Sequence, residues 1–178
     1  MRLLKHEDIR KVGSGSIGGS NVWRTYGRWY GAPVVLLDMA KGFAPAFVGV
    51  LWISHVAGIL AGAAAMAGHA RPLFLGFAKG GKMVATAAGA FIGVAPIVGL
   101  AVALFWLVTF VLSRYTSVAS VASALAIPVL AVAFGEPNSV VIFAAAAGVA
   151  VIVLNRANLK RLRAGTESRF RLRKTARV

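Results

Sequence analysis

Long apolar stretches, separated by short segments that carry most of the charge, constrain this chain more than any other feature. Hydrophobic residues make up 58% of its 178 residues, yet Lys and Arg total 20 against 5 acidic residues. A soluble domain rarely combines such a composition with such a charge excess, so the apolar and cationic segments must be segregated. The sequence therefore predicts an all-α, polytopic transmembrane helix bundle. The apolar stretches cover residues 33–52, 53–68, 84–112, 117–134 and 139–154.

The third stretch is too long for one span. As a single helix its 29 residues would measure about 43 Å, whereas a bilayer core needs about 30 Å. The segment "GVAPIVG" at its centre holds two glycines and a proline, which favour a tight turn. We expect two short spans here, and six spans in all.

The distribution of positive charge supports the count of six. Of the basic residues, six precede residue 31, three lie in 69–82, one is Arg114 and nine follow residue 154. With six spans, all four groups fall on one face, which the positive-inside rule assigns to the cytoplasm. The predicted division is a cytoplasmic N-terminal segment with a glycine-rich phosphate loop, a transmembrane bundle and a basic cytoplasmic tail: 1–30, 31–154 and 155–178.

One charged pair is left inside the first span. Asp38 and Lys41 are three positions apart, so they share a helix face and can neutralise each other in lipid. We assign them a structural role and keep a direct catalytic role as the alternative. Glu167, in the tail, is also assigned a structural role.

The glycine- and serine-rich run "GSGSIGGSNVWRTYG" begins at Gly13. Glycines let backbone N–H groups converge on an anion, hydroxyls add donors, and an arginine can hold two phosphoryl oxygens at once. The GxGxxG spacing within it lacks the preceding strand of a dinucleotide fold, so that interpretation is rejected. The predicted phosphate-binding residues of this run are Gly13, Ser14, Gly15, Gly18, Asn21 and Arg24.

A second glycine-rich segment, "KGGK" at residues 79–82, precedes a predicted helix near Val84. Two ammonium groups around a flexible backbone, beside a positive helix end, indicate a second anion site on the same face. Met83 stands where a P-loop needs a hydroxyl, so a nucleotide site is rejected. The predicted substrate-binding residues here are Lys79, Gly80, Gly81 and Lys82, with His69 as a hydrogen-bonding residue.

The basic tail has two parts. The Lys and Arg residues of its distal part are typical of segments that bind anionic lipid headgroups. Asn155, Arg156, Asn158 and Arg161 lie in the first turns after the last span, where they can face the same site.

Five segments resemble, in order, those of the bacterial acyl-phosphate:glycerol-3-phosphate acyltransferases of the PlsY family. "GSGSIGGSNVWRTYG" is similar to the family's SGNIGATNVxR, and "LLDMAKG" to its LLDxxKG. "GHARPLFLGFAKGGKMVAT" resembles GHxxPxFxxFKGGKxVAT. "SRYTSVAS" and "NRANLKRLRAGTE" resemble RYxSLxS and HRxNIxRLxxGxE.

The resemblance implies transfer of an acyl group from acyl phosphate to the 1-hydroxyl of glycerol 3-phosphate, giving lysophosphatidic acid, in a bacterial inner membrane. Catalytic roles are expected for Ser14, Arg24, Lys82 and Asn158. Ser14 lacks the His and Asp partners of a serine nucleophile, so we expect it to donate a hydrogen bond to phosphate. Ser117, Asn155 and Arg156 are expected to bind substrate. We expect no cofactor, metal or nucleic acid, contact with membrane lipids, and a functional link to an enzyme that makes acyl phosphate.

The sequence departs from the family pattern at Ser16, Ser20 and Ala78 and, most notably, at Asn155, where the family usually has His. The family also usually has a span before its first signature, so we expect one of seven to be missing here. The HxxxxD signature of other glycerolipid acyltransferases follows none of the three histidines. An anion transporter stays as the alternative function, although only Asp38 and Lys41 place charge inside a span.

Overall fold

The computed structural model describes residues 8–170, which form seven α-helices and two short 3₁₀ helices and contain no strand. The first seven residues of the predicted N-terminal segment and the last eight of the basic tail lie outside the described residues. The elements are η1 (Ile9–Lys11), α2 (Gly19–Tyr26), α3 (Arg28–Trp52), α4 (His55–Ala70), η2 (Leu73–Leu75), α5 (Val84–Val94), α6 (Pro96–Ser113), α7 (Thr116–Ala133) and α8 (Asn138–Arg163).

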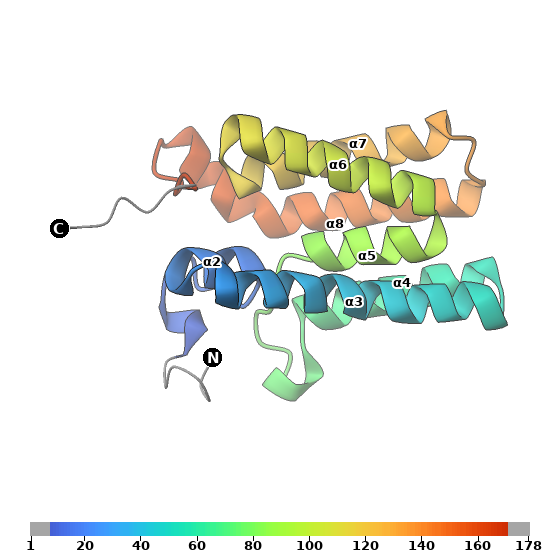
Figure 1. Ribbon diagram of the computed structural model, residues 1–178, viewed down its shortest axis with the longest axis horizontal. Coiled ribbons are helices and arrows are strands. Elements are labelled where there is room, and N and C mark those ends of the chain that lie inside the picture. The colour runs from blue at the N-terminus through green and yellow to red at the C-terminus, as the bar shows by residue number, and fades with distance from the viewer. Residues whose placement is uncertain (1–7, 171–178) are drawn as a thin grey trace.

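The helices form two layers (Figure 1). Helices α2, α3, α4 and α5 pack together in one layer, and α6, α7 and α8 form the other. Small residues let the helices approach closely, as where Gly42 of α3 lies against the backbone of Thr86 in α5. Such contacts are the usual basis of helix packing in lipid. Phe91 and Phe143 stack across the layers, with ring centroids 4.5 Å apart.

The predicted break in the third apolar stretch is confirmed. Helix α5 ends at Val94 and α6 begins at Pro96, with Ala95 between them. Proline at the first position of α6 has no N–H that the helix would need, so it begins a helix there and ends the preceding one.

Four of the helices in 8–170 are long and apolar enough to cross a membrane: α3, α6, α7 and α8. Helix α5 is apolar but has only 11 residues, and α4 has 16. The helix boundaries thus follow the predicted segments, while the count of six crossings remains a prediction.

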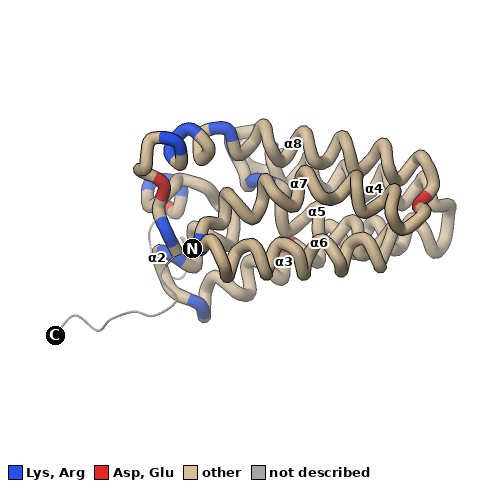
Figure 2. Tube along the Cα trace, turned by 90° about the horizontal axis from the view of Figure 1, so that it is seen from above, with Lys and Arg blue, Asp and Glu red and all other residues tan. Residues whose placement is uncertain are grey.

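Positive charge gathers at one end of the bundle (Figure 2). This basic end consists of residues 8–28, 71–83, 114–115 and 156–170. The connections at the opposite end, residues 53–54, 95 and 134–137, contain no Lys or Arg. Lys41, within α3, is the exception among the described basic residues.

Candidate active site

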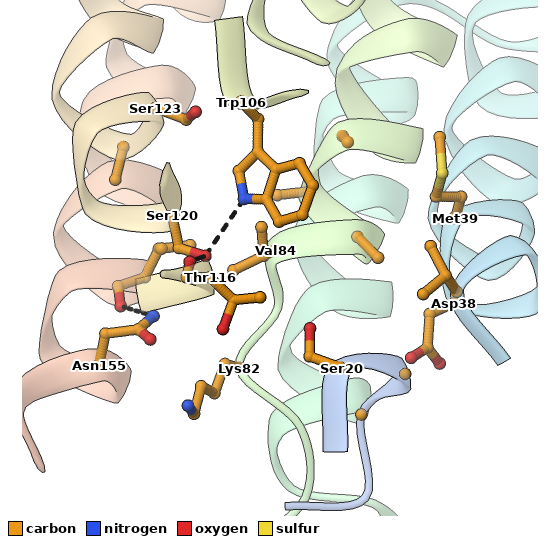
Figure 3. A pocket seen from close by; sticks show the side chains of 18 of the residues that line it. Ser20, Asp38, Met39, Lys82, Val84, Trp106, Thr116, Ser120, Ser123 and Asn155 are labelled. Carbon is orange, nitrogen blue, oxygen red and sulfur yellow. Dashed lines mark hydrogen bonds between the residues drawn. The ribbon is translucent and has the colours of Figure 1, made fainter. Parts of the chain in front are cut away.

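A cavity of about 340 Å³ lies between the two layers (Figure 3). Its polar end, at the basic end of the bundle, is lined by Ser14, Ser20, Arg24, Lys82 and Asn155. Its other end is lined by apolar residues that include Val102, Leu107, Ile127 and Ala147. Thr116 and Ile127 both line it, and eleven residues of helix separate them by about 16 Å. The cavity therefore runs from a cationic mouth deep into the apolar bundle.

Asn21 holds the glycine-rich loop in shape. Its side-chain oxygen accepts a hydrogen bond from the Ser14 N–H at 2.9 Å. Its amide donates to the carbonyls of Ser16 at 2.9 Å and Val12 at 3.1 Å. Gly13 has a φ of +61°, and a side chain there would collide with the Asn21 amide. Asn21 thus holds the loop in shape through these contacts, and its expected contact with substrate stays a prediction.

Lys82 begins a chain of polar contacts that ends at Arg161. The Lys82 ammonium donates to Asn158 Oδ1 at 2.7 Å, and Asn158 Nδ2 donates to Glu167 Oε1 at 2.7 Å. Arg161 Nε donates to the other carboxylate oxygen of Glu167 at 2.8 Å. Asn158 and Glu167 are buried. Both ends of the Asn158 amide are therefore occupied, which makes it a bridge that positions Lys82.

Burial changes the acidity of this cluster. It lowers the pKa of Lys82 to about 8, although the Glu167 charge opposes the change. Burial also lowers the pKa of Arg24, again opposed by Glu167. Burial by itself would raise the pKa of Glu167, but hydrogen bonds from Asn158 and Arg161 hold it below its usual value. Lys82 is therefore a cation whose full charge depends on pH near 8.

The beginning of the tail folds back to close the polar end. The Phe170 N–H donates to the carbonyl of Arg114 at 2.8 Å, and its ring packs edge-on against Phe110 and Trp23. Arg24 donates to the carbonyl of Ser168 at 3.2 Å. Glu167 and Ser168 thus contact residues at the polar end of the cavity, whereas sequence analysis treated this part of the tail mainly as surface charge.

The second glycine-rich segment is built on the end of α4. The N–H groups of Gly80 and Gly81 donate to the carbonyls of Ala70 and His69 at 2.9 and 3.0 Å. A side chain on Gly81 would collide with the His69 ring. These glycines are therefore explained by close packing, and their N–H groups are used within the protein.

The predicted pair of Asp38 and Lys41 forms, with 2.6 Å between the carboxylate and the ammonium. The same carboxylate oxygen lies 3.4 Å from His69 Nδ1. Residue spacing did not indicate that His69 would complete this cluster, because the packing of α4 on α3 brings it there from a distance of 31 positions along the chain.

Comparison with known proteins identifies the chain. The model of the family described as glycerol-3-phosphate acyltransferase matches residues 1–165. Glycerol-3-phosphate acyltransferase of Aquifex aeolicus is 41% identical over 94% of this chain and 88% of its own. That of Sinorhizobium medicae is 43% identical over 95% and 82%.

Solved structures agree. A crystal structure of PlsY, an integral membrane glycerol 3-phosphate acyltransferase, in its glycerol 3-phosphate form superimposes with a TM-score of 0.90 at 40% identity, over 95% of this chain and 85% of the other. The lysophosphatidic acid form gives a TM-score of 0.84 at 39% identity, over 89% and 82%. The chain belongs to the PlsY family of glycerol-3-phosphate acyltransferases. It is therefore an acyltransferase of phospholipid synthesis and an integral membrane protein.

Within this PlsY-family protein, the predicted site residues lie in several places. Those that line the cavity are Ser14, Gly18, Asn21, Arg24, Asp38, His69, Lys82 and Asn155. Gly13 and Gly15 shape the loop beside it through their positive φ values. Lys79 is exposed and lines a shallow hollow shared with Ser14 and Lys11.

Two expected substrate contacts lie away from the cavity. Arg156 is exposed, because Asn155 and Asn158 occupy the inward face of α8 and Arg156 points elsewhere. Ser117 is buried, makes no hydrogen bond of good geometry, and lies near Glu167, whose charged form it favours. Neither residue is among those that line the cavity, and their expected contacts with substrate stay predictions.

Sequence analysis missed a polar stripe on α7. Thr116, Ser120 and Ser123 line the cavity (Figure 3), and the Trp106 indole donates to Ser120 Oγ at 3.3 Å. Their spacing of four and three residues in an otherwise apolar helix indicates one face. That periodicity was the signal available in the sequence.

Proposed function

We propose that this chain transfers an acyl group from acyl phosphate to the 1-hydroxyl of glycerol 3-phosphate, producing lysophosphatidic acid and inorganic phosphate. The observation that carries the proposal is a cavity whose mouth is cationic and whose far end is apolar. Such a cavity suits a reaction between two phosphate-bearing substrates of which one has a long hydrocarbon tail. Membership of the PlsY family supports the glycerol 3-phosphate acceptor.

The mouth offers several groups to phosphoryl oxygens. Arg24 and Lys82 line it from α2 and from the loop before α5. The N-terminal end of α2 lines it with Gly18, Gly19 and Ser20. The free N–H groups at the start of a helix can donate hydrogen bonds to an anion. In a partly dry site these charge-assisted contacts are stronger than they would be in water.

The apolar arm suits the acyl chain. Side chains from α6, α7 and α8 surround it, among them Val102, Trp106 and Ile127. An acyl phosphate placed with its tail in this arm would present its carbonyl carbon at the level of Lys82 and Asn155. The acceptor hydroxyl would approach from the polar end.

The chemistry requires no covalent enzyme intermediate. The 1-hydroxyl oxygen forms a bond to the carbonyl carbon, the bond from that carbon to the phosphate oxygen breaks, and the departing phosphate takes the hydroxyl proton. Acyl phosphate is an activated anhydride, so the protein has to align the substrates and neutralise charge. A serine nucleophile needs a histidine as its base. Because His69 is packed between Asp38 and Gly81, it does not serve Ser14 in this way, and we assign Ser14 as a hydrogen-bond donor.

The proposal includes the orientation of the protein. The basic end would face the cytoplasm of a bacterial inner membrane by the positive-inside rule. An enzyme that produces acyl phosphate would then supply the donor at this face. Membership of an acyltransferase family disfavours the transporter alternative.

Purified protein in lipid nanodiscs, given glycerol 3-phosphate with either acyl phosphate or acyl-CoA, tests the donor. We expect lysophosphatidic acid and equimolar phosphate from acyl phosphate, without added divalent metal, and loss of both in Lys82→Ala. Product from acyl-CoA alone would overturn the donor assignment and leave the acceptor in place.

A further inference from the structure

The segment between α4 and α5 leaves the bundle sideways (Figure 1). It presents three large apolar side chains outward: Leu73, Phe74 and Phe77 are 73%, 84% and 61% exposed. None of the residues of η2 is buried. The apolar surface of this segment therefore has no counterpart among the described residues.

The segment nevertheless has a defined shape. The N–H groups of Leu75 and Phe77 donate to the Pro72 carbonyl at 3.1 Å, and that of Gly76 donates to Leu73 at 2.9 Å. Arg71 donates to the Phe77 carbonyl at 3.3 Å. Gly76 and Phe77 both have a positive φ, which is an unfavourable backbone conformation for a bulky residue such as Phe77. The fold thus maintains a costly conformation that turns apolar side chains outward.

Helix lengths give the depth of this segment. Trp29 and Trp52 are exposed near the two ends of α3, and aromatic residues of this kind mark membrane interfaces. His69, near the end of α4, contacts Asp38, which lies nine residues, or about 13 Å, inward from Trp29 along α3. Helix α4 therefore ends well inside the level marked by Trp29, and the segment emerges within the thickness of the membrane.

Charge and continuity identify what covers the segment. Arg71 and Lys79 are exposed at its two ends, where they suit anionic headgroups. Val56, Leu60, Ala64 and Ala67 are exposed along one face of the preceding helix α4, so this apolar face leads along the helix to the segment. Apolar side chains flanked by cations are the pattern of an interfacial anchor.

We propose that residues 71–79 form an interfacial anchor that inserts Leu73, Phe74 and Phe77 at the boundary between headgroups and acyl chains of the leaflet on the basic side. The anchor leads directly into Gly80, Gly81 and Lys82. It therefore holds the second glycine-rich segment at a fixed depth below the membrane surface. This inference does not depend on the identity of the acyl donor.

Fluorescence quenching measures this depth directly. The chain has no cysteine, so Phe74→Cys can carry a single small fluorophore in nanodiscs of phosphatidylcholine and phosphatidylglycerol. The quenchers are aqueous iodide and lipids with a nitroxide either near the carbonyl end or near the methyl end of the acyl chain. Leu125→Cys, exposed in the middle of α7, is the control for deep lipid, and Arg163→Cys, exposed at the end of α8, is the aqueous control.

We expect the Phe74 probe to be protected from iodide and to be quenched about twofold more by the shallow nitroxide than by the deep one, as insertion at the boundary requires. The Leu125 probe should show the reverse preference. Iodide quenching equal to that of the Arg163 probe would overturn the proposal and indicate a surface for a protein partner. Deep quenching equal to that of Leu125 would overturn the assigned depth.

Discussion

Lys82 and Asn158 are joined by a hydrogen bond of 2.7 Å between the ammonium and Oδ1, although 76 positions separate them in the chain. The contact links the segment that precedes α5 to the inward face of α8. Glu167 accepts from the other end of the same amide, so three segments converge on one cation. We therefore expect a substitution of Asn158 or Glu167 to change the position of the Lys82 ammonium and so to weaken its binding of phosphate.

Removing a cation from the mouth should slow catalysis strongly. We expect Arg24→Ala or Lys82→Ala to cost at least about 2 kcal/mol in transition-state stabilisation, or about thirtyfold in kcat/KM, because each loses a charge-assisted contact in a partly dry site. Steady-state kinetics with both substrates varied provide the measurement. Arg163→Ala, at an exposed position, is the matched control. Equal losses in all three variants would mean that surface charge controls the rate.

The rate should fall above about pH 8. Burial lowers the pKa of Lys82 to about 8, so its charge, and with it phosphate binding, is lost as the pH rises through that value. We expect kcat/KM to show an alkaline limb there, since this parameter reports the free enzyme. In Lys82→Arg the guanidinium stays charged, and the limb should move to higher pH. An unchanged limb in this variant would assign the titration to another group.

The same pKa has a consequence for stability. The pKa of Lys82 is lowered in the folded protein from an ordinary value of 10.5, so the unfolded chain binds more protons between about pH 8 and 10.5. The contribution of this group to the free energy of unfolding should therefore rise with pH across that window. Lys82→Met should lack this rise in thermal denaturation measured across the window.

Gly81→Ala should disturb the loop through contact with His69. The added methyl group meets the imidazole directly, and overpacking of this kind costs typically about 1–3 kcal/mol. We expect a lower melting temperature together with a lower kcat/KM, because Lys82 follows immediately. Gly68→Ala is the matched control, since a side chain there meets no atom within 4 Å. Normal stability and activity of Gly81→Ala would show that the loop adapts.

The sequence predicted the helices better than it predicted the site. Hydropathy and Pro96 located the break between α5 and α6, because both signals are local. Spacing also predicted the contact between Asp38 and Lys41. These features depend on residues close together in the chain.

The site depends on contacts that sequence spacing does not encode. Asn21 and Asn158 are expected to contact substrate. The fold also engages their amides in hydrogen bonds with Ser14, Ser16, Lys82 and Glu167, which residue spacing does not predict. Phe170 lies among the basic residues of the tail, so the sequence did not predict its contact with Phe110, which the fold brings about. Residue type therefore indicates the chemistry of the mouth, while tertiary packing determines which contacts these residues make within the protein.

Topology can be tested by cysteine labelling, because the native chain has no cysteine. We expect Ser14→Cys and Gly165→Cys to react with an impermeant maleimide from the cytoplasmic side, and Glu136→Cys to react from the opposite side. Six crossings place the first two positions on one face and the third on the other. Labelling of Ser14→Cys and Gly165→Cys from opposite sides would contradict the predicted count of six.

Asn155 tests whether proton transfer is needed where the family usually has His. Its amide is buried at the cavity wall and donates to the Val151 carbonyl at 2.9 Å. An amide can donate a hydrogen bond but cannot shuttle a proton near neutral pH, whereas histidine can do both. Because the substrate phosphates can accept the hydroxyl proton, we expect Asn155 to contribute by positioning.

Asn155→His should therefore leave kcat and its pH profile nearly unchanged, and the native protein should be a competent enzyme. Asn155→Leu, of similar size but without polar atoms, should instead raise KM through the loss of positioning. The measurement is kcat and KM across pH 5 to 9 for all three proteins, a range that brackets the histidine pKa. A large gain in kcat for Asn155→His, with a new titration in the histidine range, would contradict positioning and show that the native site lacks a proton-transfer group.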